Sequence, residues 1–277
     1  MSVWSLGADG IAAEEPPVKL QQIRSMESLE RLMEWLWGKD VHSAAPRVLH
    51  VVAALPWQGE LRALRIEERT PRSEFDALAL SVARARADAI VTTGRILREE
   101  PRLRHEAVVA PRLAELLAGW RRRGGREAFP ISLILTSGRG IDLDHPLFAA
   151  PGRPVLFTSH QGVDRLRQSG WRSGGLIQAV GVERPSLRQA LDWLRSEAGA
   201  ATVSVEAGPS TAAQLYTEPA AVEELMLSVY RGEVEEDLVG PPLPSWQVLT
   251  SSLPREISRR TVAEASGHWT LLRRSGS

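Results

Sequence analysis

The feature of the sequence that most restricts its fold is an alternation of short apolar runs with longer amphipathic stretches, which begins after Pro46. The apolar runs are rich in Val, Ile and Leu, and the stretches between them repeat apolar residues at helical spacing. Strands that alternate with helices predict βαβ units, and therefore a mainly parallel sheet covered by helices on both faces. The expected strands are 47–55, 88–94, 131–138, 153–159, 175–180, 201–206 and 222–230, and the expected helices are 73–86, 111–122, 161–171, 186–199 and 210–216.

The N-terminal residues 1–46 lie outside this alternation. Within them, 26–38 shows helical periodicity, with Ser25 or Ser28 as possible N-caps and Gly38 at the end. The apolar positions on one side of this expected helix are Leu29, Leu32, Met33, Leu36 and Trp37. We expect an N-terminal extension whose single helix packs on the main domain.

The C-terminal part also changes character. Residues 240–246 form a Pro-rich connector, and 246–273 predict extended chain with a closing hairpin and no intervening helix. Such strands would add to one edge of the sheet in antiparallel fashion. The expected organisation is therefore the extension 1–46 followed by one α/β domain over 47–277.

Composition excludes several classes of function. Lys and Arg together number 34, as do Asp and Glu, so no net field favours nucleic acid or an anionic membrane as a partner. The arginine cluster 121–126 is interpreted as a solvated helix end. The absence of cysteine excludes disulfides and thiolate metal sites. No basic, apolar leader and no run of about 18 apolar residues is found, so we expect a soluble, cytoplasmic protein.

Three expected strands end in segments suited to chemistry: 92–103, 156–162 and 205–211. In each, small or hydroxyl residues lead from a strand into a helix and leave backbone N–H groups free to bind a phosphate. Ligands bind at the carboxyl ends of strands in open α/β sheets, and parallel strands would bring all three segments to one edge. The alternative is that each is an ordinary turn. Glu206, at the end of the third strand, would face the ligand.

Arg95 and Arg98 follow Gly94 in the first of these segments. A guanidinium there could bind a phosphate, including the 2′-phosphate of NADP, or could pair with Glu99 and Glu100 on a helix surface. The six histidines are scattered without the spacing of a metal site, so we expect no metal. The GxSxG, GxxxxGK[ST] and GxGxxG motifs are absent, which argues against a serine hydrolase, a P-loop enzyme and a standard Rossmann site.

The order of several segments resembles the reductase domain of riboflavin biosynthesis, a pyrimidine reductase that is usually fused to a deaminase. Residues 77–103 are similar to its signature, in which an Arg-Ala-x-Ala-Asp-Ala strand leads into Gly-x-x-x-Arg-x-x-x-Pro. Residues 120–148, 205–215, 222–230 and 268–274 are similar to later parts of that domain. The resemblance implies a dihydrofolate-reductase-like fold over roughly the whole expected domain.

The resemblance also implies a function: an NADPH-dependent reductase of a ribosylated pyrimidine or another small heterocycle, often a homodimer. Glu206 would lie beside the nicotinamide and the substrate as a proton relay or orienting group, because reduction of a ring-opened ribose at C1′ needs both a hydride and a proton. The implied cofactor contacts are Gly94, Arg95, Thr158, Ser159, Gly208, Pro209, Ser210 and Thr211, and the implied substrate contacts are Trp57, Pro101, Leu103 and Arg104.

The substrate half departs from the family pattern more than the cofactor half. Pro56 and Gln58 stand where the family has the Ser and Asp of a Ser-x-Asp-Gly turn, Glu106 replaces an Arg, and Ala207 replaces the first Gly of the phosphate turn. Trp57 could stack on a substrate ring or serve only the core. These departures leave open an alternative: a catalytically inactive relative that binds nucleotide or a protein partner.

Overall fold

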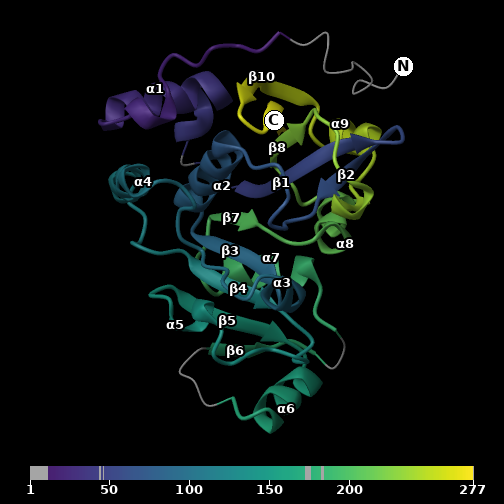
Figure 1. The fold of residues 1–277 in the computed structure, drawn as a ribbon. Coiled ribbons are helices and arrows are strands. Elements are labelled where there is room, and N and C mark those ends of the chain that lie inside the picture. Colours follow the sequence, from purple (N-terminus) through teal and green to yellow (C-terminus); the bar gives the residue numbers. More distant parts are fainter. Residues whose placement is uncertain (1–11, 44, 46, 172–175, 182–183, 277) are drawn as a thin grey trace.

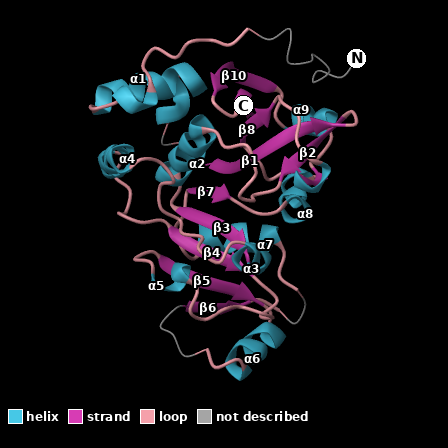
Figure 2. Cartoon of the chain, viewed as in Figure 1, coloured by secondary structure: helices cyan, strands magenta, loops and turns pink. Residues whose placement is uncertain are grey.

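The computed structural model describes residues 12–43, 45, 47–171, 176–181 and 184–276. They form an eleven-stranded sheet covered by helices on both faces (Figures 1 and 2). The strands are β1 (Arg47–Trp57), β2 (Glu60–Leu64), β3 (Ala89–Thr93), β4 (Ile131–Leu135), β5 (Arg153–Thr158), β6 (Leu176–Ala179), β7 (Thr202–Val205), β8 (Glu224–Tyr230), β9 (Val239–Pro242), β10 (Arg255–Glu264) and β11 (Gly267–Ser275).

The helices mostly fall where periodicity predicts them. They are α1 (Met26–Trp37), α2 (Glu74–Arg86), α3 (Gly94–Glu99), α4 (Pro111–Arg123), α5 (Pro146–Ala149), α6 (His160–Gln168), α7 (Leu187–Ser196), α8 (Pro209–Ala212) and α9 (Trp246–Ser252), with short 3₁₀ turns at Leu20–Gln22, Lys39–His42, Ala213–Tyr216 and Glu236–Leu238. Ser73 caps α2 as expected, and Ser25 and Ser28 form a reciprocal capping box at the start of α1.

The sheet confirms the predicted fold class. Its order is β10-β11-β8-β1-β7-β3-β4-β5-β6, in which the neighbours from β8 to β6 are all parallel and β10 and β11 are antiparallel at one edge. Successive residues of β1 enter different cores: Val48 packs with α7, and Leu49 packs with α1 and α2. This alternation is what a parallel strand covered on both faces requires.

β1 is much longer than its neighbour β7. The last residue of β1 that pairs with β7 is His50, whereas β1 continues to Trp57 and turns back as β2. Seven residues of strand rise about 23 Å, so the β1–β2 hairpin projects well beyond the end of β7. Gln58 and Gly59 form the turn, both with positive φ.

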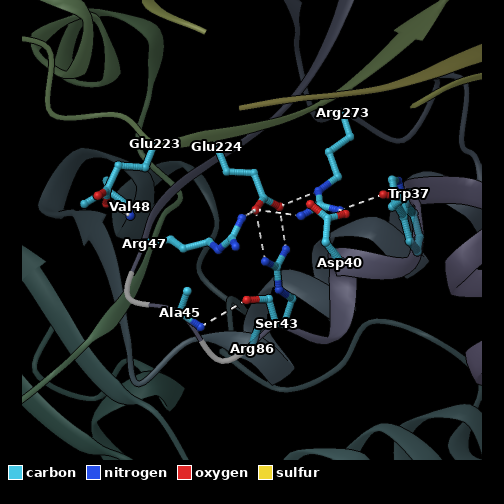
Figure 3. Close-up of polar contacts among 10 residues, drawn as sticks. All are labelled: Trp37, Asp40, Ser43, Ala45, Arg47, Val48, Arg86, Glu223, Glu224 and Arg273. Carbon is cyan, nitrogen blue, oxygen red and sulfur yellow. Dashed lines mark hydrogen bonds and ion pairs between the residues drawn. The ribbon is translucent and has the colours of Figure 1, made fainter. Parts of the chain in front are cut away.

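The extension is tied to the sheet by a buried charge cluster (Figure 3). The carboxylate of Glu224, at the start of β8, accepts hydrogen bonds from Arg47, Arg86 and Arg273. Arg273 also donates to the carbonyl oxygen of Trp37 and to Asp40, both at 2.6 Å. The apolar side of α1 is fully buried against the same face. One cluster therefore joins α1 and the turn after it to β1, α2, β8 and β11.

Three sequence predictions are corrected. Residues 246–252 are helical rather than extended, because Ser245 caps α9 through the Val248 N–H group. The expected connector contains β9, which pairs with β2. Arg121 is buried rather than solvated, since it donates to the carbonyl oxygens of Ala85 and Ala87 near the end of α2. In the part of the chain that the structure describes, no helix is long and apolar enough to cross a membrane.

Candidate functional site

The three segments singled out in the sequence lie at one edge of the sheet. They follow β3, β5 and β7, which run parallel, with β7 beside β3 and only β4 between β3 and β5. The turn after β4, around Thr136, completes the row. The prediction that these three strand ends lie at the same edge of the sheet is therefore confirmed.

Glycines allow the turns after β3, β4 and β5 to interlock. A Cβ on Gly94 would stand 2.8 Å from both Thr136 Oγ1 and Ile141 Cδ1. A Cβ on Gly138, whose φ is +78°, would overlap the carbonyl oxygen of Gly162, and a Cβ on Gly162 would overlap Thr158 Oγ1. Gly94 is thus required by packing against the next turn.

The turn at Gly208 has the opposite surroundings. Gly208 caps α8, with Pro209 in the first helical position, and its carbonyl oxygen accepts from Thr211 and Ala212 at 2.9 and 3.0 Å. A Cβ built on Gly208 would meet no described atom within 4 Å. The space over this turn is open, and Ser210 is exposed beside it. Packing does not explain this glycine, whereas close approach by a ligand would.

Glu206 is held by an arginine that sequence reasoning did not identify. Its backbone N–H donates to Val91 at 2.9 Å, which fixes the end of β7 against β3. Arg84 of α2 donates through Nε to both carboxylate oxygens at 3.0 and 3.1 Å, and through Nη2 to one of them at 2.7 Å. The Arg84 side chain is 4% exposed and that of Glu206 is 10% exposed. The one signal for Arg84 is that it begins the Arg-x-Arg-Ala-Asp segment before β3.

Arg84 also positions the loop after α3. Its Nη1 donates to the carbonyl oxygens of Arg104 and Glu106 at 3.0 and 2.7 Å. His105 between them is buried, with Nδ1 2.8 Å from Ser132 Oγ and with Nε2 lacking a hydrogen-bond partner among the described residues. Burial lowers the pKa of His105 to about 4, partly opposed by the charge of Glu206. The imidazole is therefore neutral at pH 7.

A second carboxyl group, that of Glu100, lies in the same cluster. Glu100 ends α3 and is half-buried. Its carbonyl oxygen lies 3.1 Å from His145 Nε2. Burial raises the pKa of its carboxyl group; Arg84 opposes that rise, and Glu206 and Glu99 add to it. Glu100 therefore lies within electrostatic range of the Arg84–Glu206 pair.

The implied cofactor contacts differ in burial: those at the end of β5 are buried, and Arg95 of α3 is exposed. Thr158 is buried and its Oγ1 has no hydrogen-bond partner among the described residues, while Ser159 Oγ caps α6 by accepting from Gly162. Arg95 is 68% exposed and pairs with Glu99 at 2.7 Å, as the surface alternative predicts. Arg98 donates to the carbonyl oxygen of Arg139 instead of pairing with Glu100.

The implied substrate contacts are more dispersed. The carbonyl oxygen of Arg104 accepts from Arg84, which in turn binds Glu206. The side chain of Arg104 is exposed, with Nη1 3.7 Å from the carboxylate of Glu106. Leu103 packs on a small core and Pro101 is exposed. Trp57 is partly buried against the core of α1 and α2, on the hairpin that projects beyond β7. The structure does not bring Trp57 to Glu206.

A cavity of about 280 Å³ lies next to the turn after β5. It is lined by His160, Val163, Asp164, Arg167, Ile177 and Ala179, from α6 and β6. Ser159, one of the implied cofactor residues, precedes His160 in the sequence but does not line this cavity. No group of three or more His, Cys, Asp or Glu side chains within the described ranges could hold a metal ion.

The parallel order from β8 to β6, with antiparallel strands at one edge, defines a reductase fold shared with solved proteins. A pyrimidine reductase-like protein from Corynebacterium diphtheriae superposes with a TM-score of 0.63 and 19% identity, over 87% of this chain and 97% of that one. RibD from Acinetobacter baumannii superposes with a TM-score of 0.57 and 14% identity, over 90% of this chain and 63% of that longer one. The riboflavin biosynthesis reductase Rib7 of Saccharomyces cerevisiae superposes with a TM-score of 0.51 and 11% identity, over 84% of this chain and 91% of that one.

At these identities the likeness establishes the fold. No family model and no curated protein matches the sequence. The dihydrofolate-reductase-like fold expected from the segment order is confirmed, and the three similar structures are named a pyrimidine reductase-like protein, RibD and a riboflavin biosynthesis reductase. The roles of individual residues have to be argued from the site itself.

Proposed function

We propose that the protein is an NADPH-dependent reductase of a ribosylated pyrimidine or a related small heterocycle. The observation that carries the proposal is the meeting of the turns at Gly94, Thr158 and Gly208 beside Glu206 at one edge of the sheet. A dinucleotide laid along this edge would cross all three turns. The names of the neighbours with the same fold support a reductase.

The residues present fit a dinucleotide. Gly208 leaves open space over its turn, and Ser210 is exposed beside it. The backbone N–H groups of these turns and the Ser210 hydroxyl would bind phosphate and ribose oxygens, and Arg95 is exposed enough to turn from Glu99 to a 2′-phosphate. When bound, the nicotinamide supplies the hydride; the chain supplies orientation and the proton.

The competing proposal is a nucleotide-binding relative without turnover. It is favoured by the β1–β2 turn, where Gln58 adopts φ of +49° and carries an amide in place of the family's carboxylate. It is also favoured by Glu106, which points an exposed carboxylate where a phosphate-binding arginine is expected. The homodimer implied by the resemblance and the cytoplasmic location stay predictions under either proposal.

The test is a titration of the protein with NADPH and then NADH, followed by energy transfer from tryptophan to the reduced nicotinamide. The proposal expects saturable micromolar binding of NADPH. Arg95→Gln should remove any preference for NADPH over NADH without changing the binding of NADH. Absence of binding to either cofactor, in a folded sample, would contradict the proposal and favour a non-enzymatic protein.

A further inference from the structure

The two carboxyl groups of the site have contrasting surroundings. Both oxygens of Glu206 accept from Arg84, whose remaining donors bind the loop carbonyls of Arg104 and Glu106. Glu206 therefore cannot turn toward a ligand without leaving Arg84 unpaired in a buried position. Such separation is costly, since a buried charge without its partner destabilises a protein by several kcal/mol.

The carboxyl group of Glu100, unlike that of Glu206, is not held by hydrogen bonds to other described residues. Within the residues that the structure describes, its carboxyl group makes no hydrogen bond and no ion pair. Its backbone, in contrast, is firmly placed: its N–H donates to Ile96 at 2.7 Å, and its carbonyl oxygen accepts from Leu103 at 3.0 Å. The main chain of Glu100 is thus fixed, and the loop that follows it is bound by Arg84 at Arg104 and Glu106, which keeps its carboxyl group within electrostatic range of the Arg84–Glu206 pair.

The charged groups around Glu100 come from each neighbouring element. Arg84 belongs to α2, Glu206 follows β7, Glu99 precedes it on α3, and His145 before α5 meets its carbonyl oxygen. Burial and the two glutamates favour the neutral carboxyl group, whereas Arg84 favours the carboxylate. Two titratable groups in one site with divergent surroundings are the usual arrangement of an acid and a fixed charge.

We propose that Glu100 is the acid–base residue of the site, and that Glu206, held by Arg84, is its fixed electrostatic partner. This inference rests on the proposed function. When a hydride from a reduced nicotinamide adds to C1′ of a ring-opened ribosylamine, the C=N π bond breaks and the nitrogen takes the proton of Glu100. The imine is reduced to an amine, the nicotinamide is oxidised, and Glu100 is left as a carboxylate.

The protonation of Glu100 can be measured without any ligand. In protein labelled with ¹³C at the glutamate carboxyl carbon, the signal lost in Glu100→Gln identifies Glu100. It should titrate at higher pH than the exposed glutamates. Glu206→Gln should lower its midpoint, because a negative charge is removed, and Arg84→Met should raise it. A Glu100 signal that titrates with the exposed glutamates and ignores both substitutions would overturn the inference.

The catalytic part is tested with NADPH and a ribosylated pyrimidine phosphate as the probe substrate. Glu100→Gln should bind NADPH within about two-fold of wild type and lose turnover by about 10²- to 10⁴-fold, the usual contribution of a general acid. Glu115→Gln, at an exposed position of α4, is the matched control and should keep full turnover. In wild type the rate should fall as pH rises through the pKa of Glu100, and Glu100→Asp should move that limb.

The failures are distinguishable. A folded wild type that binds no NADPH contradicts the proposed function, and the inference with it. A wild type that binds and turns over, together with an active Glu100→Gln, overturns the inference alone. Loss of NADPH binding in Glu100→Gln would also overturn it, because Glu100 would then be a cofactor contact rather than the proton donor.

Discussion

Two carboxylates in this molecule are each bound by an arginine of α2, with different results. Arg86 reaches Glu224 at the amino edge of the sheet, and Arg84 reaches Glu206 at the carboxyl edge. Glu224 is fully buried and shared by three arginines, whereas Glu206 has one arginine and lies within electrostatic range of Glu100, whose carboxyl group makes no ion pair among the described residues. Three arginines thus surround Glu224, whereas a second carboxyl group lies within electrostatic range of the Arg84–Glu206 pair.

The amino-edge cluster is therefore interpreted as structural. Burial by itself would raise the pKa of Glu224, but Arg86 and Arg273 outweigh burial and hold it well below its usual range. Because Arg273 also binds Trp37 and Asp40, the same carboxylate secures the N-terminal extension. The comparison teaches that the number of arginines around a buried carboxylate, rather than burial alone, distinguishes the structural cluster from the pair at the candidate site.

The largest effect is expected for Glu224→Gln. Loss of the negative charge leaves the buried Arg86 without a counter-charge and Arg273 with Asp40 alone, and breaking a buried pair in this way costs about 3–5 kcal/mol. Urea denaturation followed by circular dichroism should show that loss or an unfolded variant. Glu115→Gln, which breaks an exposed pair, should change stability by less than about 0.5 kcal/mol. An equal, small effect of both substitutions would show that the amino-edge cluster is not structural.

The depressed pKa of Glu224 gives this comparison a pH dependence. A carboxyl group with a lowered pKa in the folded state contributes stability that is complete above its unfolded value, about 4.3, and is lost as pH falls below it. The acid limb of wild-type stability should therefore be steeper below pH 4.3 than that of any folded Glu224→Gln protein.

Arg84→Met should have the next largest effect. It leaves Glu206 without its partner and the carbonyl oxygens of Arg104 and Glu106 without a donor, for a loss of about 3 kcal/mol. Arg84→Lys should recover only part of the lost stability, because one ammonium group cannot make all the hydrogen bonds of the planar guanidinium. Denaturation measures the stability, and limited proteolysis within 101–109 reports release of the loop. A stable Arg84→Met protein with a protected loop would remove Arg84 as the organiser of the site.

Periodicity predicts most of the fold because packing follows it. Leu29, Leu32 and Leu36 lie at helical spacing and all three are fully buried in α1. Short elements escape such reasoning: α3 begins directly at Gly94 where β3 ends, and β9 contains two prolines, which argue against a strand. β9 forms nonetheless at the margin of the sheet, paired with β2.

The site was predictable in position but not in pairing. A strand that ends in a carboxylate and enters a Gly-Pro turn marks Glu206 from local sequence. Its partner Arg84 lies 122 residues away in the sequence, on a helix whose contacts depend on β7 entering the sheet between β1 and β3. Local spacing suggests a pair between Glu100 and Arg98, but within the residues that the structure describes Arg98 donates to the carbonyl oxygen of Arg139 and Glu100 has no ion-pair partner. Pairing across a crossover connection is tertiary information that one sequence does not carry.

A smaller effect is expected from His50. It is buried, with Nδ1 2.7 Å from the hydroxyl of Tyr216, and burial lowers its pKa to about 4. The unfolded chain takes up a proton near pH 6.5 and the folded chain does not, so stability is complete above pH 6.5 and falls between pH 6.5 and 4. His50→Gln should reduce the loss of folding stability between pH 7 and 4.5 by about 2.5 kcal/mol, measured by urea denaturation. An unchanged pH dependence would show that His50 is not buried as a neutral imidazole.

The smallest effect comes from a pair of glycines that divide structural from ligand-binding roles at one edge. Gly94→Ala places a methyl group 2.8 Å from Thr136 and Ile141, and overpacking of this kind costs about 1–2 kcal/mol. Gly208→Ala places a methyl group in open space, so stability should change by less than about 0.5 kcal/mol. If a dinucleotide lies over Gly208, the same methyl group should weaken NADPH binding about ten-fold, or 1.4 kcal/mol. Thermal denaturation and NADPH titration of both variants separate the two roles. A Gly208→Ala protein that is fully stable and binds NADPH like wild type would place the cofactor elsewhere on this edge.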